Sequence, residues 1–220
     1  MKSPFLYFFS LFIFLNFTSN AQKKAYKTIQ YLTTDGGTIE ADLFSASKDK
    51  AVIFAHGAIF NKESWHFLAL KLQKEGITGL AINFRGYGNS KKGTTSKRSL
   101  DILDAVNYLK DKGYKSIIIV GGSMGGAAVV RALNTNYDKI VTKVVLMAPA
   151  GGKALMYKSL DKLFIVSEKE GLYKRVTALY NNSAKPKKLH VYKGSSHAQH
   201  MFKAKYAKTL VKEIITFIKS

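Results

Sequence analysis

The sequence predicts an α/β protein with a mainly parallel sheet of about eight strands, covered by helices on both faces. Two observations predict this class. From residue 51 to the end, short apolar segments alternate with longer amphipathic ones, which is the pattern of β-α units. Before them, two strand-like segments flank "DGG" at 35–37, which predicts an antiparallel hairpin at the edge of the sheet.

Each element follows from a local pattern. Aliphatic runs predict strands that are buried on both faces. In 61–76, Trp65, Leu68 and Leu72 recur at helical spacing and the segment ends at a glycine, which predicts a helix. The expected strands are 27–34, 38–46, 51–57, 77–84, 116–122, 141–150, 162–167 and 187–194, and the expected helices are 61–76, 100–113, 124–134, 172–183 and 204–220.

The first residues have the pattern of an export signal. Lys2 precedes an apolar run at 5–17, and small residues follow up to Ala21. The run is shorter than the ~20 apolar residues that span a bilayer, so an uncleaved anchor is the weaker interpretation. We therefore expect a signal peptide at 1–21, cleaved near Ala21, and a single exported domain at 22–220, periplasmic or secreted.

Composition excludes several function classes. The 220 residues contain no cysteine, which removes disulfides, thiolate metal sites and cysteine nucleophiles. With 35 Lys and Arg against 14 Asp and Glu, the net charge is +21, which favours contact with anionic surfaces. Only four of these basic residues are arginine, and the lysines are spread along the chain. We therefore expect no specific nucleic-acid recognition and favour solvated helix faces as the main use of the lysines.

Glycines surround Ser123 in "GGSMGG", between an apolar strand and a helix rich in Ala and Gly. The spacing does not fit a dinucleotide-binding loop, and the lysine of a phosphate-binding G-K-S/T loop is missing. It fits G-x-S-x-G, with Gly121 and Gly125 on either side of the serine. A nucleophile at a sharp strand-to-helix turn needs small neighbours, so this pattern predicts that Ser123 is a nucleophile. The alternative is a tight turn with an incidental serine, which predicts no partner groups elsewhere.

A base and an acid for such a serine are available. "GSSHAQH" forms a polar loop after the last expected strand, and its His197 is the expected base, with His200 as the alternative. The acid is expected between serine and histidine in chain order. Glu168 and Glu170 lie just after the strand "KLFIVS" and are the candidates. This acid would hold the histidine tautomer and stabilise the imidazolium.

From about residue 51 to the end, the chain resembles the α/β-hydrolase family. The resemblance implies Ser123 as nucleophile, His197 as base, and the backbone amides of Ala58 and Met124 as the oxyanion site. The segments that carry it are "HGAIFNKESW", "INFRGYGNS", "GGSMGG", "LFIVSEKEGL" and "PKKLHVYKGSSHAQHMF".

The resemblance also assigns a structural role and reveals one departure. His56 and Gly57 would form the turn of the oxyanion site, without His56 reacting. The family's acid is usually aspartate, but its position here is occupied by Glu170, with Glu168 as the alternative. A glutamate can serve if the backbone accommodates its extra methylene.

These residues predict hydrolysis of a small acyl ester or thioester through an acyl-enzyme intermediate, with no metal or organic cofactor. Only about a dozen residues separate "LMAPA" from "KLFIVS", where resembling enzymes often insert a lid, so we expect an open, shallow site without one. The alternatives are a non-catalytic envelope binding protein with this fold, and a lysophospholipase-like or peptidase-like hydrolase.

Overall fold

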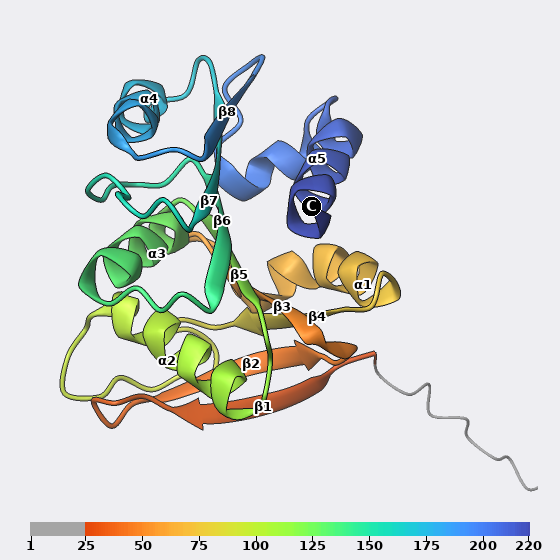
Figure 1. Ribbon diagram of the computed structural model, residues 1–220, viewed down its shortest axis with the longest axis vertical. Helices are drawn as coiled ribbons and strands as arrows, with labels where there is room; N and C mark the ends of the chain where they lie inside the picture. The colour runs from red at the N-terminus through yellow and green to blue at the C-terminus, as the bar shows by residue number, and fades with distance from the viewer. Residues whose placement is uncertain (1–24) are drawn as a thin grey trace, which may run out of the picture.

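The structure, a computed structural model, describes residues 25–220 and shows one sheet between two layers of helices (Figure 1). The sheet has eight strands in the order β1-β2-β4-β3-β5-β6-β7-β8. The β1–β2 and β2–β4 pairs are antiparallel, and every pair from β4–β3 onward is parallel. The predicted fold class is therefore confirmed. The expected signal peptide at 1–21 lies outside the described residues.

The observed elements match the expected order. The strands are β1 (Lys27–Leu32), β2 (Thr38–Phe44), β3 (Ser47–Ala55), β4 (Ile77–Ile82), β5 (Ile117–Gly122), β6 (Val141–Met147), β7 (Asp161–Ser167) and β8 (Lys187–Tyr192). The α-helices are α1 (His66–Lys74), α2 (Arg98–Asp111), α3 (Met124–Thr135), α4 (Tyr173–Asn182) and α5 (Ala207–Lys219), and two 3₁₀ segments are η1 (Lys62–Trp65) and η2 (Ala198–Lys203).

Most boundaries differ from the sequence prediction by up to three residues, and two differ by more. Strand β3 begins at Ser47 rather than at residue 51. Ser47 pairs with Ile77 ahead of a register shift, and the polar "SKDK" has no apolar pattern that would predict a strand. The helix expected at 61–76 is split, with η1 preceding α1.

The central strands are buried on both faces. In β5, Ile117 and Ile119 face a core shared with α2, α3 and α4, while Ile118 and Val120 face a second core shared with α1 and α5. Successive side chains of a strand point to opposite faces of the sheet. Because both faces are covered by helices here, every residue of the run is apolar. Figure 1 shows the same division, with α2, α3 and α4 on one side of the sheet and α1 and α5 on the other.

Strand β6 leads into β7 through residues 148–160, which contain no helix or strand. This segment leaves the carboxyl edge of the sheet, where lids are inserted in many enzymes of this architecture. Its length and lack of regular structure agree with the expected absence of a sizeable lid domain. Within residues 25–220, no helix is both long and apolar enough to cross a bilayer.

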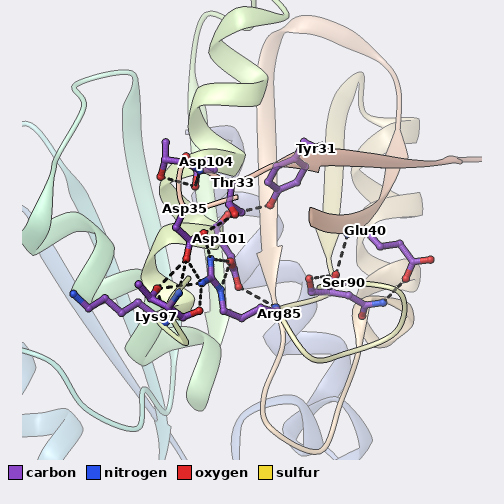
Figure 2. Close-up of polar contacts among 12 residues, drawn as sticks. Tyr31, Thr33, Asp35, Glu40, Arg85, Ser90, Lys97, Asp101 and Asp104 are labelled. Atoms are coloured by element: carbon purple, nitrogen blue, oxygen red, sulfur yellow. Dashed lines mark hydrogen bonds and ion pairs between the residues drawn. The ribbon is translucent and has the colours of Figure 1, made fainter. Parts of the chain in front are cut away.

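A buried arginine ties the opening hairpin to the helical layer (Figure 2). Arg85 follows β4 and is only 1% exposed. Its guanidinium donates to Asp35 in the hairpin turn at 2.7 Å and to Asp101 in α2 at 2.7 Å. It also donates to the carbonyl oxygen of Thr95 at 2.6 Å. These bonds fix the segment between β4 and α2, which passes beside the candidate site.

We predict that Asp35→Asn lowers the free energy of unfolding by about 3 kcal/mol at pH 7, because it leaves the buried Arg85 with one of its two carboxylate partners. The hydrogen bond from Arg85 holds the pKa of Asp35 well below its usual range. The carboxylate therefore stabilises the fold above about pH 4 and loses this effect as the pH falls further. Urea denaturation from pH 7 to pH 3 measures the difference. If the difference in the free energy of unfolding between parent and variant does not become smaller below pH 4, this account is contradicted.

Candidate active site

Ser123 occupies a strained turn between β5 and α3. Its backbone angles are φ 50° and ψ −114°, a region that costs a non-glycine residue about 1–3 kcal/mol. Three backbone hydrogen bonds hold it there. Its N–H donates to Met147 at 2.9 Å, and its carbonyl accepts from Ala127 and Ala150, each at 3.0 Å. These three hydrogen bonds keep the turn in its strained conformation.

The two glycines of the G-x-S-x-G pattern are required by close backbone contacts. A Cβ on Gly125 would lie 2.3 Å from the carbonyl oxygen of Ala55 at the end of β3. A Cβ on Gly121 would lie 2.9 Å from the Cα of Gly126 in the first turn of α3. Both distances are below any that a real side chain adopts. The glycines thus allow α3 to start directly against the ends of β3 and β5.

The structure brings three of the predicted side chains into one hydrogen-bonded chain. His197 Nε2 lies 2.8 Å from Ser123 Oγ, and His197 Nδ1 lies 2.5 Å from Glu170 Oε2. An ionised carboxylate only accepts hydrogen bonds, so Nδ1–H donates to Glu170. Nε2 is then the acceptor for the Ser123 hydroxyl. All three side chains follow the carboxyl ends of parallel strands, which explains why they meet at one edge.

The alternative base and acid lie elsewhere. Glu168 accepts a weak hydrogen bond from the Gly194 backbone at 3.4 Å and does not contact His197. His200 packs its ring against Phe60 at 5.1 Å. Of the two candidates in each pair, the geometry places His197 next to Ser123 and Glu170 next to His197.

The loop that carries Glu170 is fastened to the loop that carries His197. Ser167 Oγ donates to the carbonyl oxygen of Ser196 at 2.6 Å. The amides of Glu168 and Lys169 donate to Tyr192 and Gly194, each at 2.9 Å. The Glu170 carboxylate is nearly buried, with its side chain 2% exposed. The backbone thus accommodates the longer glutamate side chain by a fixed turn after β7.

The turn after β3 presents a backbone amide next to this chain. Within residues 25–220, the N–H groups of Ala58 and Met124 have no hydrogen-bond acceptor. The C=O of the peptide before Ala58 accepts from His56 Nδ1 at 2.8 Å and from Phe60 N–H at 3.1 Å. In a trans peptide the N–H points opposite to the C=O, so these bonds also set the direction of the Ala58 N–H.

His56 can form both of its hydrogen bonds only as a neutral ring. Its Nε2 accepts from the Phe84 backbone N–H at 3.2 Å while Nδ1–H donates to Gly57. Burial lowers the pKa of His56 to about 4, so the ring is uncharged at neutral pH. The structural role that the family resemblance implied for His56 and Gly57 stays a prediction, and these hydrogen bonds describe how the turn is held.

Two further side chains hold the same turn and were missed by sequence reasoning. Gln199 in η2 accepts from the Gly57 N–H at 2.8 Å through Oε1 and donates to Ser64 Oγ at 2.6 Å through Nε2. Tyr87 donates from its hydroxyl to the Ala58 carbonyl oxygen at 2.9 Å. Both residues lie in segments that carry the family resemblance, "HAQHM" and "RGYGNS". Nothing in the sequence, however, distinguishes a glutamine or a tyrosine with such a role from any other. Only the packing of loops from distant parts of the chain reveals them.

The described residues hold no group of three or more His, Asp or Glu side chains suited to a metal ion. The groups that the geometry brings together are a hydroxyl, an imidazole, a carboxylate and two free amides. This set can move a proton from Ser123 to His197 and can hold a developing oxyanion.

Comparison with known proteins identifies the family of the chain. A family model described as "alpha/beta hydrolase fold" matches residues 50–160. A carboxylesterase of Bacillus subtilis is 31% identical over 103 residues, covering 45% of this chain and 41% of that protein. A probable protein phosphatase methylesterase 1 of Dictyostelium discoideum is 26% identical over 136 residues, covering 50% of this chain and 42% of that protein. The chain thus matches less than half the length of these relatives.

Solved esterases share the fold. An esterase of Exiguobacterium antarcticum superposes with a TM-score of 0.73 at 15% identity, covering 88% of this chain and all of that one. The Pyrococcus furiosus esterase Pf2001 gives a TM-score of 0.73 at 19% identity, covering 88% of this chain and 92% of that one.

We predict that Ser123→Gly is more stable than Ser123→Ala by about 1 kcal/mol, because glycine adopts a positive φ without steric strain. Both variants lose the bond to His197, so their difference isolates the strain of the turn. Chemical denaturation of the two variants measures it. A glycine variant less stable than the alanine variant would show that the turn stores no strain at this residue.

Proposed function

Because the chain belongs to the α/β-hydrolase family, we propose that it is a serine hydrolase that cleaves small carboxylic esters or thioesters through an acyl-enzyme on Ser123. The observation that carries this proposal is the chain from Glu170 through His197 to Ser123, with contacts of 2.5 and 2.8 Å. The similarity to a carboxylesterase and to solved esterases supports a hydrolase of this kind.

In the first step, His197 Nε2 takes the hydroxyl proton as Ser123 Oγ bonds to the substrate carbonyl carbon. The carbonyl π electrons move to oxygen and form a tetrahedral oxyanion. Glu170 keeps Nδ1–H facing it and stabilises the imidazolium that results. The C–O or C–S bond to the leaving group then breaks, and His197 returns the proton to that group.

The oxyanion would be held by the amides of Ala58 and Met124. Both donors are free in the described chain, and the start of α3 adds the positive end of its dipole. These donors are fixed before substrate arrives, so little reorganisation accompanies the reaction. Water then attacks the acyl-enzyme with His197 again acting as base, which releases the acid and regenerates Ser123.

The proposal includes export. The sequence pattern of residues 1–21 supports a cleaved signal peptide and a periplasmic or secreted mature protein. The natural substrate would then be a small acyl ester that reaches the enzyme outside the cytoplasm.

The acid is tested by Glu170→Gln, for which we predict a loss of about 10⁴ in kcat on a p-nitrophenyl ester, by analogy with Asp→Asn in a serine protease triad. Glu168→Gln is the matched control and should retain kcat within about twofold, since Glu168 does not contact His197. Steady-state kinetics with both variants, beside Ser123→Ala, measures this. Equal losses in the two glutamine variants would argue against Glu170 as the orienting acid. Hydrolysis by Ser123→Ala at the parent rate would reject the proposed function.

The oxyanion turn is tested through Gln199. We predict that Gln199→Met lowers kcat by about tenfold to a hundredfold and leaves KM within about threefold, because the turn is loosened while ground-state binding is unaffected. Ser64→Ala removes only the hydrogen bond that Gln199 Nε2 donates to Ser64, and it should lower kcat by less than about fivefold. Initial rates over a range of ester concentrations separate the two parameters. A change confined to KM would assign Gln199 to substrate binding instead.

A further inference from the structure

Residues of α1, η2 and α5 line a groove. Figure 1 shows α1 and α5 on the same side of the sheet. The groove has a volume of about 920 Å³. Its walls are apolar: Phe67 from α1, Phe202 from η2, and Val211 and Ile215 from α5. The Phe67 and Phe202 rings meet edge to face at 4.9 Å, and Phe67 is 36% exposed. An exposed aromatic beside an apolar trough suggests a surface that contacts another apolar phase.

Lysines surround these apolar walls. Four of the eleven residues that line the groove are lysines, Lys71 on α1 and Lys208, Lys212 and Lys219 on α5, and none of the eleven has an acidic side chain. Lys219 pairs with Glu75 at 2.5 Å. The other three form no ion pair within residues 25–220.

The acidic residue of α5 is directed elsewhere. Glu213 accepts from the Tyr192 hydroxyl at 2.6 Å and pairs with His190, both on β8. The cationic charge of the groove is therefore not neutralised by its own helix. Four lysines from two separate helices thus lie around one apolar groove.

We infer that this groove docks the protein on an anionic phospholipid bilayer. Apolar side chains with lysines beside them are typical of protein surfaces that lie in a membrane interface. Phe67 and Phe202 would enter the boundary of the acyl chains, while the lysine stems run along the groove and place their ammonium groups at the phosphates. A second copy of the chain does not fit equally well, because it would set lysines against lysines.

This surface is separate from the chemistry at Ser123, so the inference does not depend on the proposed function. The two are nevertheless neighbours in the chain, since η2 begins directly after His197 and contains Phe202. Docking would leave the sheet edge that carries the site next to the lipid surface.

The test is sedimentation of the full chain with vesicles of equal parts phosphatidylglycerol and phosphatidylcholine, and with vesicles of phosphatidylcholine alone. We expect the parent chain to bind the anionic vesicles. The triple variant Lys71→Gln/Lys208→Gln/Lys212→Gln should have an affinity roughly a hundredfold lower, because each basic residue near an anionic surface raises the affinity by a factor of about five. All chains keep residues 1–24, so any lipid contact of that segment is common to them. Hydrogen exchange on the vesicles should show added protection in α1 and α5.

The matched control removes the same charge from exposed lysines outside the groove, in Lys139→Gln/Lys153→Gln/Lys174→Gln. We expect this variant to lose less than about fivefold in binding, and circular dichroism to show both triple variants folded. Equal losses in the two triple variants would overturn the inference in favour of diffuse charge attraction. Absence of binding to anionic vesicles, or binding insensitive to lipid charge and to both sets of substitutions, would also overturn it. An acidic protein would then be the occupant to test.

Discussion

The close approach of α3 to the ends of β3 and β5 is the constraint on which the rest of the site depends. It is possible only because Gly121 and Gly125 have no side chain. The approach forces Ser123 into a positive φ and so lifts its hydroxyl out of the sheet edge. It also brings the first amide of α3 beside the turn after β3, where the Ala58 N–H lies. One packing contact thus places both the nucleophile and its two prospective oxyanion donors.

Hydrogen bonds between loops hold the remaining groups. The loops after β7 and β8 are tied to each other by Ser167 and by two backbone amides, which hold Glu170 and His197 in fixed relative positions. Gln199, two residues after His197, reaches back to Gly57 in the oxyanion turn. The base and the oxyanion turn are therefore mechanically linked. This linkage is what a site needs if proton transfer and oxyanion binding are to occur in the same geometry.

Much of this could be predicted from sequence, for physical reasons. Strands and helices in an α/β fold have strong apolar patterns, and the glycines around Ser123 report a steric demand that few other turns make. The choice between Glu168 and Glu170 could not be made, because the direction of a side chain in a loop depends on bonds to other loops. Gln199, Tyr87 and the partners of Arg85 were out of reach for the same reason. The lysine groove needed the fold, since Lys71 and Lys212 are far apart in the chain.

The central claim is that His197, held by Glu170, activates Ser123. The most direct test is to incubate the folded protein with a fluorophosphonate and to read the intact mass, beside His197→Ala and Ser123→Ala. The account predicts one adduct per parent chain and none on either variant over the same time. Labelling of the parent and the His197 variant at equal rates would show a serine that does not depend on the histidine. A folded parent that takes no label would contradict the account and favour a binding protein with this fold.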